Sequence, residues 1–154
     1  MPQTSARALA EKIGAKSAVV GVIGLGYVGL PLALLFEESG FPVVGFDVDP
    51  EKPRALHAGT SYIRHIGPER VAAAFRRGRI RATSDFADLA ACDAVLVCVP
   101  TPLGRHREPD LSYIRSTADR DFRDLTLYAQ ARLVVDTRNL VLPWALPSGT
   151  LVRT

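Results

Sequence analysis

The stretch at residues 18–29, which reads AVVGVIGLGYVG, constrains the fold more than any other part of the sequence. It opens with a continuous apolar run, and a run without alternation is typical of a strand buried on both faces of a parallel sheet. The run stops in the pattern Gly-x-Gly-x-x-Gly, formed by Gly24, Gly26 and Gly29. We therefore expect a buried strand, a tight glycine loop and a helix that begins near Tyr27.

The spacing of these glycines is that of a dinucleotide-binding loop. In such a loop Gly24 allows the tight turn, Gly26 leaves room for a pyrophosphate, and Gly29 lets the helix lie close to the strand. The helix N-terminus adds free N–H groups and a partial positive charge, which attract an anion. The three glycines alone are equally compatible with a strand–helix turn that binds no ligand.

An acidic residue downstream favours the dinucleotide. A second apolar strand, residues 41–46, ends at Asp47, which stands 23 residues after Gly24. A carboxylate at this point accepts hydrogen bonds from the adenosine ribose and repels a 2′-phosphate, so NAD is favoured over NADP. The alternative role of Asp47 is to cap the next turn. Asp49 is expected to cap the following helix, and Lys52 to reach either the adenosine side or solvent.

The rest of the chain alternates between apolar strands and helices. Strands are expected to begin near residues 18, 41, 79, 93 and 132. Right-handed crossovers between parallel strands then produce an α/β, Rossmann-type doubly wound sheet. For this sheet we expect the strand order 3-2-1-4-5. Residues 1–17 are expected to form a short amphipathic helix before the sheet. The tail beyond Leu140, which is broken by prolines and a glycine, is expected to be irregular.

The totals describe a soluble globular chain of 154 residues, 47% hydrophobic and 23% charged. Its apolar runs are too short to span a membrane, and its N-terminus lacks the apolar core of a signal peptide. Cys92 and Cys98, on one strand, would lie roughly 20 Å apart, far beyond disulfide range. We therefore expect reduced thiols and a cytoplasmic protein.

A second candidate contact lies at Pro100-Thr101-Pro102, directly after the fourth expected strand. In the expected topology this is the crevice where the strand order reverses, and ligands bind there. Thr101 offers a hydroxyl group to such a ligand. The alternative is a rigid turn that contacts nothing.

Other polar residues form no catalytic or metal-binding pattern. A basic cluster raises the alternative of nucleic-acid binding, but it lacks interleaved aromatic side chains and is interpreted as a solvated surface. Its members are Arg76, Arg77, Arg79 and Arg81. The three histidines lack metal-ligand spacing, and no serine or cysteine stands in a nucleophile motif. No catalytic residue and no metal site are therefore expected.

Four segments together resemble the N-terminal domain of the nucleotide-sugar 6-dehydrogenases, with the UDP-N-acetylglucosamine type most similar. They read GVIGLGYVGLPLA, GFDVDPEK, GTSYIRHI and VCVPTPLGRHREPDLSYI, and the resemblance covers residues 9–117. It implies an NAD-dependent family that oxidises C6 of a UDP-sugar twice, through a cysteine thioester, in polysaccharide biosynthesis. Residues 18–117 would then form the NAD-binding domain.

The resemblance also implies roles for individual residues. Tyr27 and Val28 would contact the pyrophosphate of NAD, and Asp47 would hold the adenosine ribose with help from Lys52. Thr101 would contact the cofactor near the crevice.

Other parts of the family pattern are missing from the sequence. The segments that carry the family's catalytic cysteine and lysine have no counterpart, and residues 118–154 resemble instead the family's extreme C-terminus. We therefore expect a dehydrogenase with its middle removed, in which the 132–136 strand completes the sheet. Such a chain would bind NAD, would be catalytically incompetent alone, and would have doubtful affinity for a UDP-sugar. The alternative is a non-catalytic interaction module that pairs with a full-length dehydrogenase.

Overall fold

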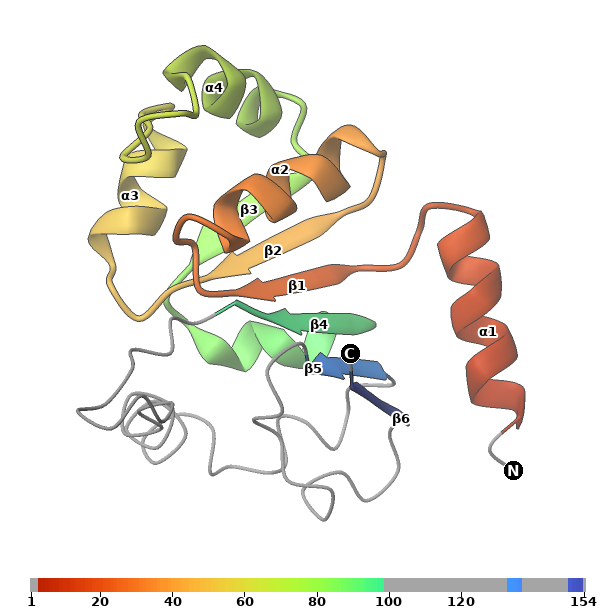
Figure 1. The fold of residues 1–154 in the computed structure, drawn as a ribbon. Coiled ribbons are helices and arrows are strands. Elements are labelled where there is room, and N and C mark those ends of the chain that lie inside the picture. Colours follow the sequence, from red (N-terminus) through yellow and green to blue (C-terminus); the bar gives the residue numbers. More distant parts are fainter. Residues whose placement is uncertain (1–2, 99–132, 137–149, 154) are drawn as a thin grey trace, which may run out of the picture.

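The computed structural model describes residues 3–98, 133–136 and 150–153, and side-chain burial over 7–98 (Figure 1). Its centre is a parallel sheet with the order β3-β2-β1-β4-β5-β6. The strands are β1 (Val20–Ile23), β2 (Val43–Phe46), β3 (Ile80–Thr83), β4 (Ala94–Val97), β5 (Leu133–Asp136) and β6 (Thr150–Arg153). The expected Rossmann-type fold and the order 3-2-1-4-5 are confirmed, and β1 lies at the centre, between β2 and β4.

Helices cover the sheet unequally. The helices are α1 (Gln3–Gly14), α2 (Gly29–Glu38), α3 (Glu51–His57) and α4 (Pro68–Arg76), and a 3₁₀ helix, η1, spans Phe86–Ala91. In Figure 1, α2, α3 and α4 lie over one face of the sheet and η1 lies under the other. Helix α1 stands beyond the end of the sheet where β1 begins.

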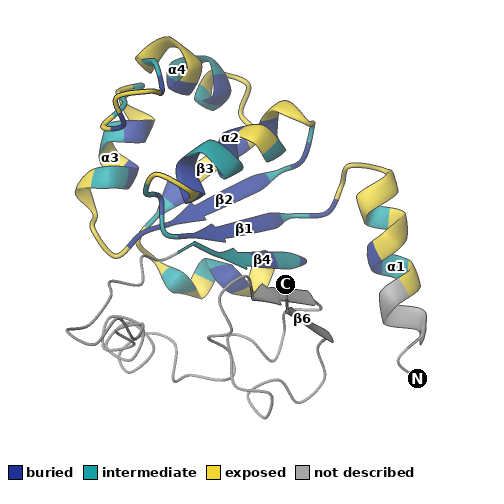
Figure 2. Ribbon diagram, in the orientation of Figure 1, coloured by how far each residue is buried: buried dark blue, intermediate teal, exposed yellow. Residues whose placement is uncertain are grey.

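The hydrophobic core forms two layers, one on each face of the sheet (Figure 2). The larger layer packs α2, α3 and α4 against the strands and includes Leu30, Leu34 and Val71. The smaller layer packs η1 against the opposite face through Phe46, Leu89 and Cys92. Strands β1 and β2 are buried along their whole length, as continuous apolar runs in a parallel sheet should be.

Two local expectations were wrong. Helix α2 begins at Gly29 rather than near Tyr27, because residues 24–28 form the turn that connects β1 to this helix. The tail expected to be irregular contains β6, which pairs in parallel with β5. The prolines and glycine before β6 obscured this strand, because such residues normally mark loops.

Candidate functional site

The glycine loop after β1 is held tightly against the sheet. Gly24 has a φ of +90°, which favours glycine, and its N–H donates to the Phe46 carbonyl at 2.7 Å. A Cβ placed on Gly29 would lie 1.7 Å from the carbonyl oxygen of Gly24. Only glycine therefore permits the start of α2 to rest directly on the turn.

The outer side of the same loop is open. A Cβ placed on Gly26 would have nothing within 4 Å, and the side chains of Tyr27 and Val28 are exposed. Within the described part of the chain, the backbone N–H groups of Gly26, Tyr27 and Val28 have no backbone acceptor, and α2 has no side-chain N-cap. These donors at a helix N-terminus fit a bound pyrophosphate.

Asp47, at the end of β2, is 5% exposed and binds the glycine loop directly. Its Oδ2 accepts from the Leu25 N–H at 2.9 Å, and its Oδ1 accepts from the Asp49 N–H at 3.1 Å. Lys52 donates to Oδ2 at 2.9 Å and thus lies on the carboxylate instead of extending into solvent. A carboxylate has about four acceptor positions, so one is left for a ribose hydroxyl.

Asp47 also acts locally, as the alternative reading allowed, because it accepts from Asp49 two residues on. Asp49, expected to cap the next helix, lies one residue before Pro50, which is the N-cap of α3. Its Oδ1 nevertheless accepts from the N–H of Glu51, the first residue of that helix, at 3.0 Å. The two roles of Asp47 are compatible, since each uses a different lone pair of the carboxylate.

Two aromatic residues near the loop were missed as site residues, although both lie in the motif GTSYIRHI. The Tyr62 hydroxyl donates to the Leu25 carbonyl at 2.7 Å. The His65 ring stacks on Tyr27, with 5.9 Å between ring centroids. The motif had shown only a resemblance, because nothing in its local pattern indicates which distant backbone group its side chains contact.

Thr101 lies outside the described residues, so its expected contact with the cofactor stays a prediction. Cys92 and Cys98 are not joined in a disulfide, and burial raises the pKa of Cys92 to about 11. In the segments that the structure describes, no group of three His, Cys, Asp or Glu could hold a metal ion. The same segments contain no helix long and apolar enough to cross a membrane.

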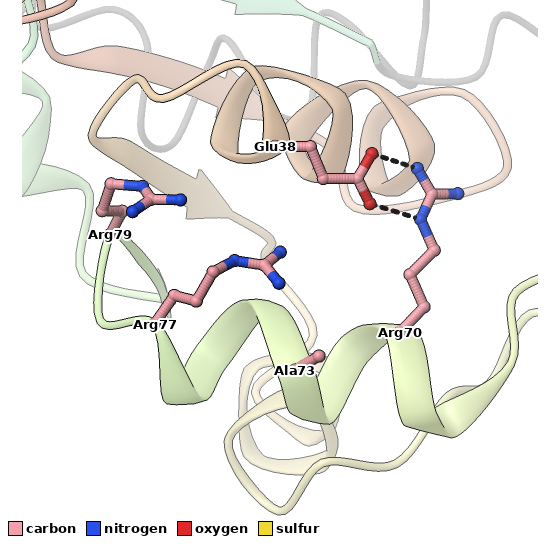
Figure 3. Close-up of a pocket in the computed structure, with 5 residues that line it drawn as sticks. All are labelled: Glu38, Arg70, Ala73, Arg77 and Arg79. Atoms are coloured by element: carbon pink, nitrogen blue, oxygen red, sulfur yellow. Dashed lines mark hydrogen bonds and ion pairs between the residues drawn. The ribbon is translucent and has the colours of Figure 1, made fainter.

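Two members of the basic cluster, Arg77 and Arg79, belong to an ion-pair network and are not simply solvated. Glu37, on α2, is fully buried and accepts from Arg77 at 2.8 and 2.5 Å, and Arg79 lies 3.1 Å from it. A hollow beside this network is lined by Glu38, Arg70, Ala73, Arg77 and Arg79 (Figure 3). Arg70 binds Glu38 with two hydrogen bonds, so the arginines of this hollow join α2 to α4 and to the segment between α4 and β3.

A central parallel strand, a glycine loop on a helix N-terminus and an acid at the end of the next strand define a dinucleotide-binding Rossmann domain. The family described as the UDP-glucose/GDP-mannose dehydrogenase family, NAD binding domain, matches residues 18–137. The chain belongs to this family, and the dinucleotide of its domain is NAD.

Individual relatives agree with this assignment. UDP-N-acetyl-D-mannosamine dehydrogenase of Pyrococcus horikoshii is 38% identical over 98 residues, 62% of this chain and 23% of that protein. UDP-N-acetyl-D-glucosamine 6-dehydrogenase of Pseudomonas aeruginosa is 36% identical over 97 residues, 63% of this chain and 22% of that protein. The chain therefore spans about a quarter of the length of these relatives.

Solved structures share the fold. A UDP-glucose dehydrogenase from Pyrobaculum islandicum aligns with a TM-score of 0.66 and 35% identity, over 77% of this chain and 28% of that one. GDP-mannose dehydrogenase from Pseudomonas aeruginosa aligns with a TM-score of 0.71 over 87% of this chain and 35% of that one, and at 23% identity it supports the fold alone.

Proposed function

We propose that this chain binds NAD through the glycine loop and Asp47, and that it is the cofactor-binding part of a UDP-sugar 6-dehydrogenase. The observation that carries the proposal is the Asp47 carboxylate, which joins β2 to the Leu25 N–H beside the open face of Gly26. Relatives named as UDP-sugar dehydrogenases, at 36–38% identity, support the substrate class.

The proposed contacts to the pyrophosphate and the ribose use groups already in place. The N–H groups of Gly26, Tyr27 and Val28 are proposed to donate to the pyrophosphate, and the remaining lone pair of Asp47 to accept from the ribose. Lys52 neutralises part of the charge of Asp47 and holds it toward the loop. Thr101 is proposed to contact the cofactor near the crevice. Bound NAD supplies a hydride acceptor.

Isothermal titration calorimetry tests the proposal. Wild-type protein is expected to bind NAD⁺ and to bind NADP⁺ more weakly, because Asp47 repels a 2′-phosphate. Asp47→Ala is expected to weaken NAD⁺ binding by about tenfold or more, since hydrogen bonds to a charged group contribute about 1.5–3 kcal/mol. Absence of NAD⁺ binding by the folded wild-type protein would refute the proposal.

We further propose that the chain alone does not turn over a UDP-sugar. The support is that the family match is to the NAD binding domain, and that neither Cys92 nor Cys98 lies in the family's nucleophile segment. Covalent oxidation needs a positioned thiolate. Purified chain mixed with UDP-N-acetylglucosamine and NAD⁺ should therefore produce no NADH, and steady NADH formation would contradict this.

The alternative function is a non-catalytic module that pairs with a full-length dehydrogenase. Its support is the same restriction of the match to one domain of much longer relatives. Co-purification of the tagged chain with a full-length UDP-N-acetylglucosamine 6-dehydrogenase would favour it. Retention no greater than that of an unrelated Rossmann protein would exclude it.

A further inference from the structure

The connection between α3 and α4, residues 58–67, is packed against the glycine loop. Ile63 and Ile66 are 2% and 3% exposed and fix this connection in the main core layer. From the anchored connection, Tyr62 reaches the Leu25 carbonyl. The donor and the acceptor are 37 residues apart in the sequence, so this bond exists only because of the tertiary fold.

Leu25 is consequently held through three different groups. Its N–H donates to Asp47, its carbonyl accepts from Tyr62, and its side chain is 1% exposed. That side chain packs so closely on β2 that a Cβ on Gly45 would lie 2.7 Å from it. Leu25 therefore has little freedom to rotate either of its peptide planes.

The carbonyl of Leu25 and the N–H of Gly26 belong to one peptide group. In a planar trans peptide these two bonds point in opposite directions. The structure contains no cis peptide bond among the residues it describes. Fixing the Leu25 carbonyl on the Tyr62 side therefore turns the Gly26 N–H to the other side of the loop.

Tyr62 also stays a donor over the working pH range. Burial is the main cause that raises the pKa of its hydroxyl, and the negative charges of Asp47 and Asp49 add to it. A protonated hydroxyl donates, whereas a phenolate would repel the carbonyl oxygen.

We infer that Tyr62 is a positioning residue of the dinucleotide site: its hydroxyl holds the Leu25 carbonyl and thereby orients the Gly26 N–H toward the pyrophosphate. This inference rests on the proposed NAD site and adds a residue to it that makes no contact with the cofactor itself. The loss of the hydroxyl should accordingly affect the pyrophosphate contacts and leave the adenosine contacts intact.

The test is Tyr62→Phe, which keeps the ring and removes the donor. Binding of NAD⁺, ADP and adenosine is measured by titration. The dissociation constants of NAD⁺ and ADP are expected to rise about two- to tenfold, the range that corresponds to one net hydrogen bond, while that of adenosine stays unchanged. In the ligand-free protein, the carbonyl ¹³C resonance of Leu25 should also move, since it reports the lost hydrogen bond.

Ser61→Ala is the matched control. Ser61 lies in the same connection, but among the described residues its hydroxyl bonds only within the turn, to Ile63. It should leave all three affinities and the Leu25 resonance unchanged, and thermal melts establish that both variants fold.

The outcomes separate the inference from the proposed function. An equal loss of affinity for all three ligands would make Tyr62 merely structural and overturn the inference. Unchanged NAD⁺ binding by Tyr62→Phe, with wild-type binding intact, would overturn it as well. If the wild-type protein binds adenosine but neither NAD⁺ nor ADP, the proposed pyrophosphate site itself is wrong.

Discussion

Two buried aspartates show how similar chemistry acquires different roles. They lie at opposite edges of the same sheet, one at the carboxyl ends of the strands and the other at their amino ends. Asp47 follows β2 and accepts from the N–H of Leu25, just after β1. Asp93 precedes β4 and accepts from the N–H of Val19, just before β1. Each carboxylate thus ties a neighbouring strand to one end of the central strand.

Each aspartate is also paired with a lysine. Lys52 lies 2.9 Å from Asp47, and Lys12 lies 2.6 Å from Asp93. The Lys12 side chain is 43% exposed, so solvent screens that pair more than the Lys52 pair, where the lysine is 32% exposed. Judged by local contacts alone, the two pairs look alike.

The difference lies in what surrounds each pair. Asp47 stands at the carboxyl ends of the strands, beside a glycine loop with open donors, where parallel sheets bind their ligands. Asp93 stands at the amino ends, where its lysine partner comes from α1. A buried aspartate–lysine pair is therefore not a site by itself, and its place on the sheet decides its role.

Gly29→Ala should have the largest effect on stability, because it disrupts the glycine loop, which lies at the carboxyl ends of the strands. Its Cβ would lie 1.7 Å from the Gly24 carbonyl oxygen, and this clash outweighs the helix propensity gained. The free energy of unfolding is expected to fall by about 3 kcal/mol, measured by urea denaturation. Gly26→Ala is the control: it should keep that stability and still weaken NAD⁺ binding. Equal stability of the two variants would contradict the packing argument.

Asp47→Asn and Asp93→Asn compare the two edges directly. The Asp47→Asn variant is expected to bind NAD⁺ about tenfold or more weakly, since it loses a charged acceptor in the site. The Asp93→Asn variant is expected to lose about 1 kcal/mol of stability and to keep the wild-type NAD⁺ affinity. Calorimetry and denaturation of both proteins provide the two numbers. If Asp93→Asn weakened NAD⁺ binding as much as Asp47→Asn, the edges would not differ in function.

Replacing the lysines should have the smallest effect. Lys12→Met and Lys52→Met are each expected to cost less than about 1 kcal/mol of stability, because both pairs are partly solvated. Only Lys52→Met should weaken NAD⁺ binding, by about threefold. The losses of stability and of NAD⁺ affinity should both be smaller at high salt, which screens the ion pairs. Melting temperatures and titrations at low and high salt measure this. A loss of affinity in Lys12→Met would show long-range coupling between the edges.

Much of the fold could be predicted from local patterns. Continuous apolar runs predicted the buried strands, and glycine and proline marked the loops between them. The crossover rule then indicated a doubly wound parallel sheet. Strand β6 could not be predicted, because a four-residue strand after prolines carries little signal of its own. Strand β6 forms through its hydrogen bonds to β5, which its local sequence does not predict.

The candidate site was predictable only where its residues follow one another at fixed spacing. The glycines and Asp47 belong to such a pattern, whereas Tyr62 and the buried Glu37 do not. Nothing in the local sequence marks Glu37 as buried, and Arg77 and Arg79 were interpreted as part of a solvated surface. Their mutual contacts span 40 residues or more, and such contacts leave no trace in local composition.

By itself, the sequence determined the cofactor loop, since only glycine permits the turn at Gly24 and the contact at Gly29. It also determined the buried strands, because their apolar side chains leave no face for water. The tertiary structure alone decided which of two similar aspartates stands beside that loop, and that Tyr62 holds it. Such roles depend on the packing of segments that are far apart in the sequence. This packing brings particular hydrogen-bonding groups together, and no local pattern encodes it.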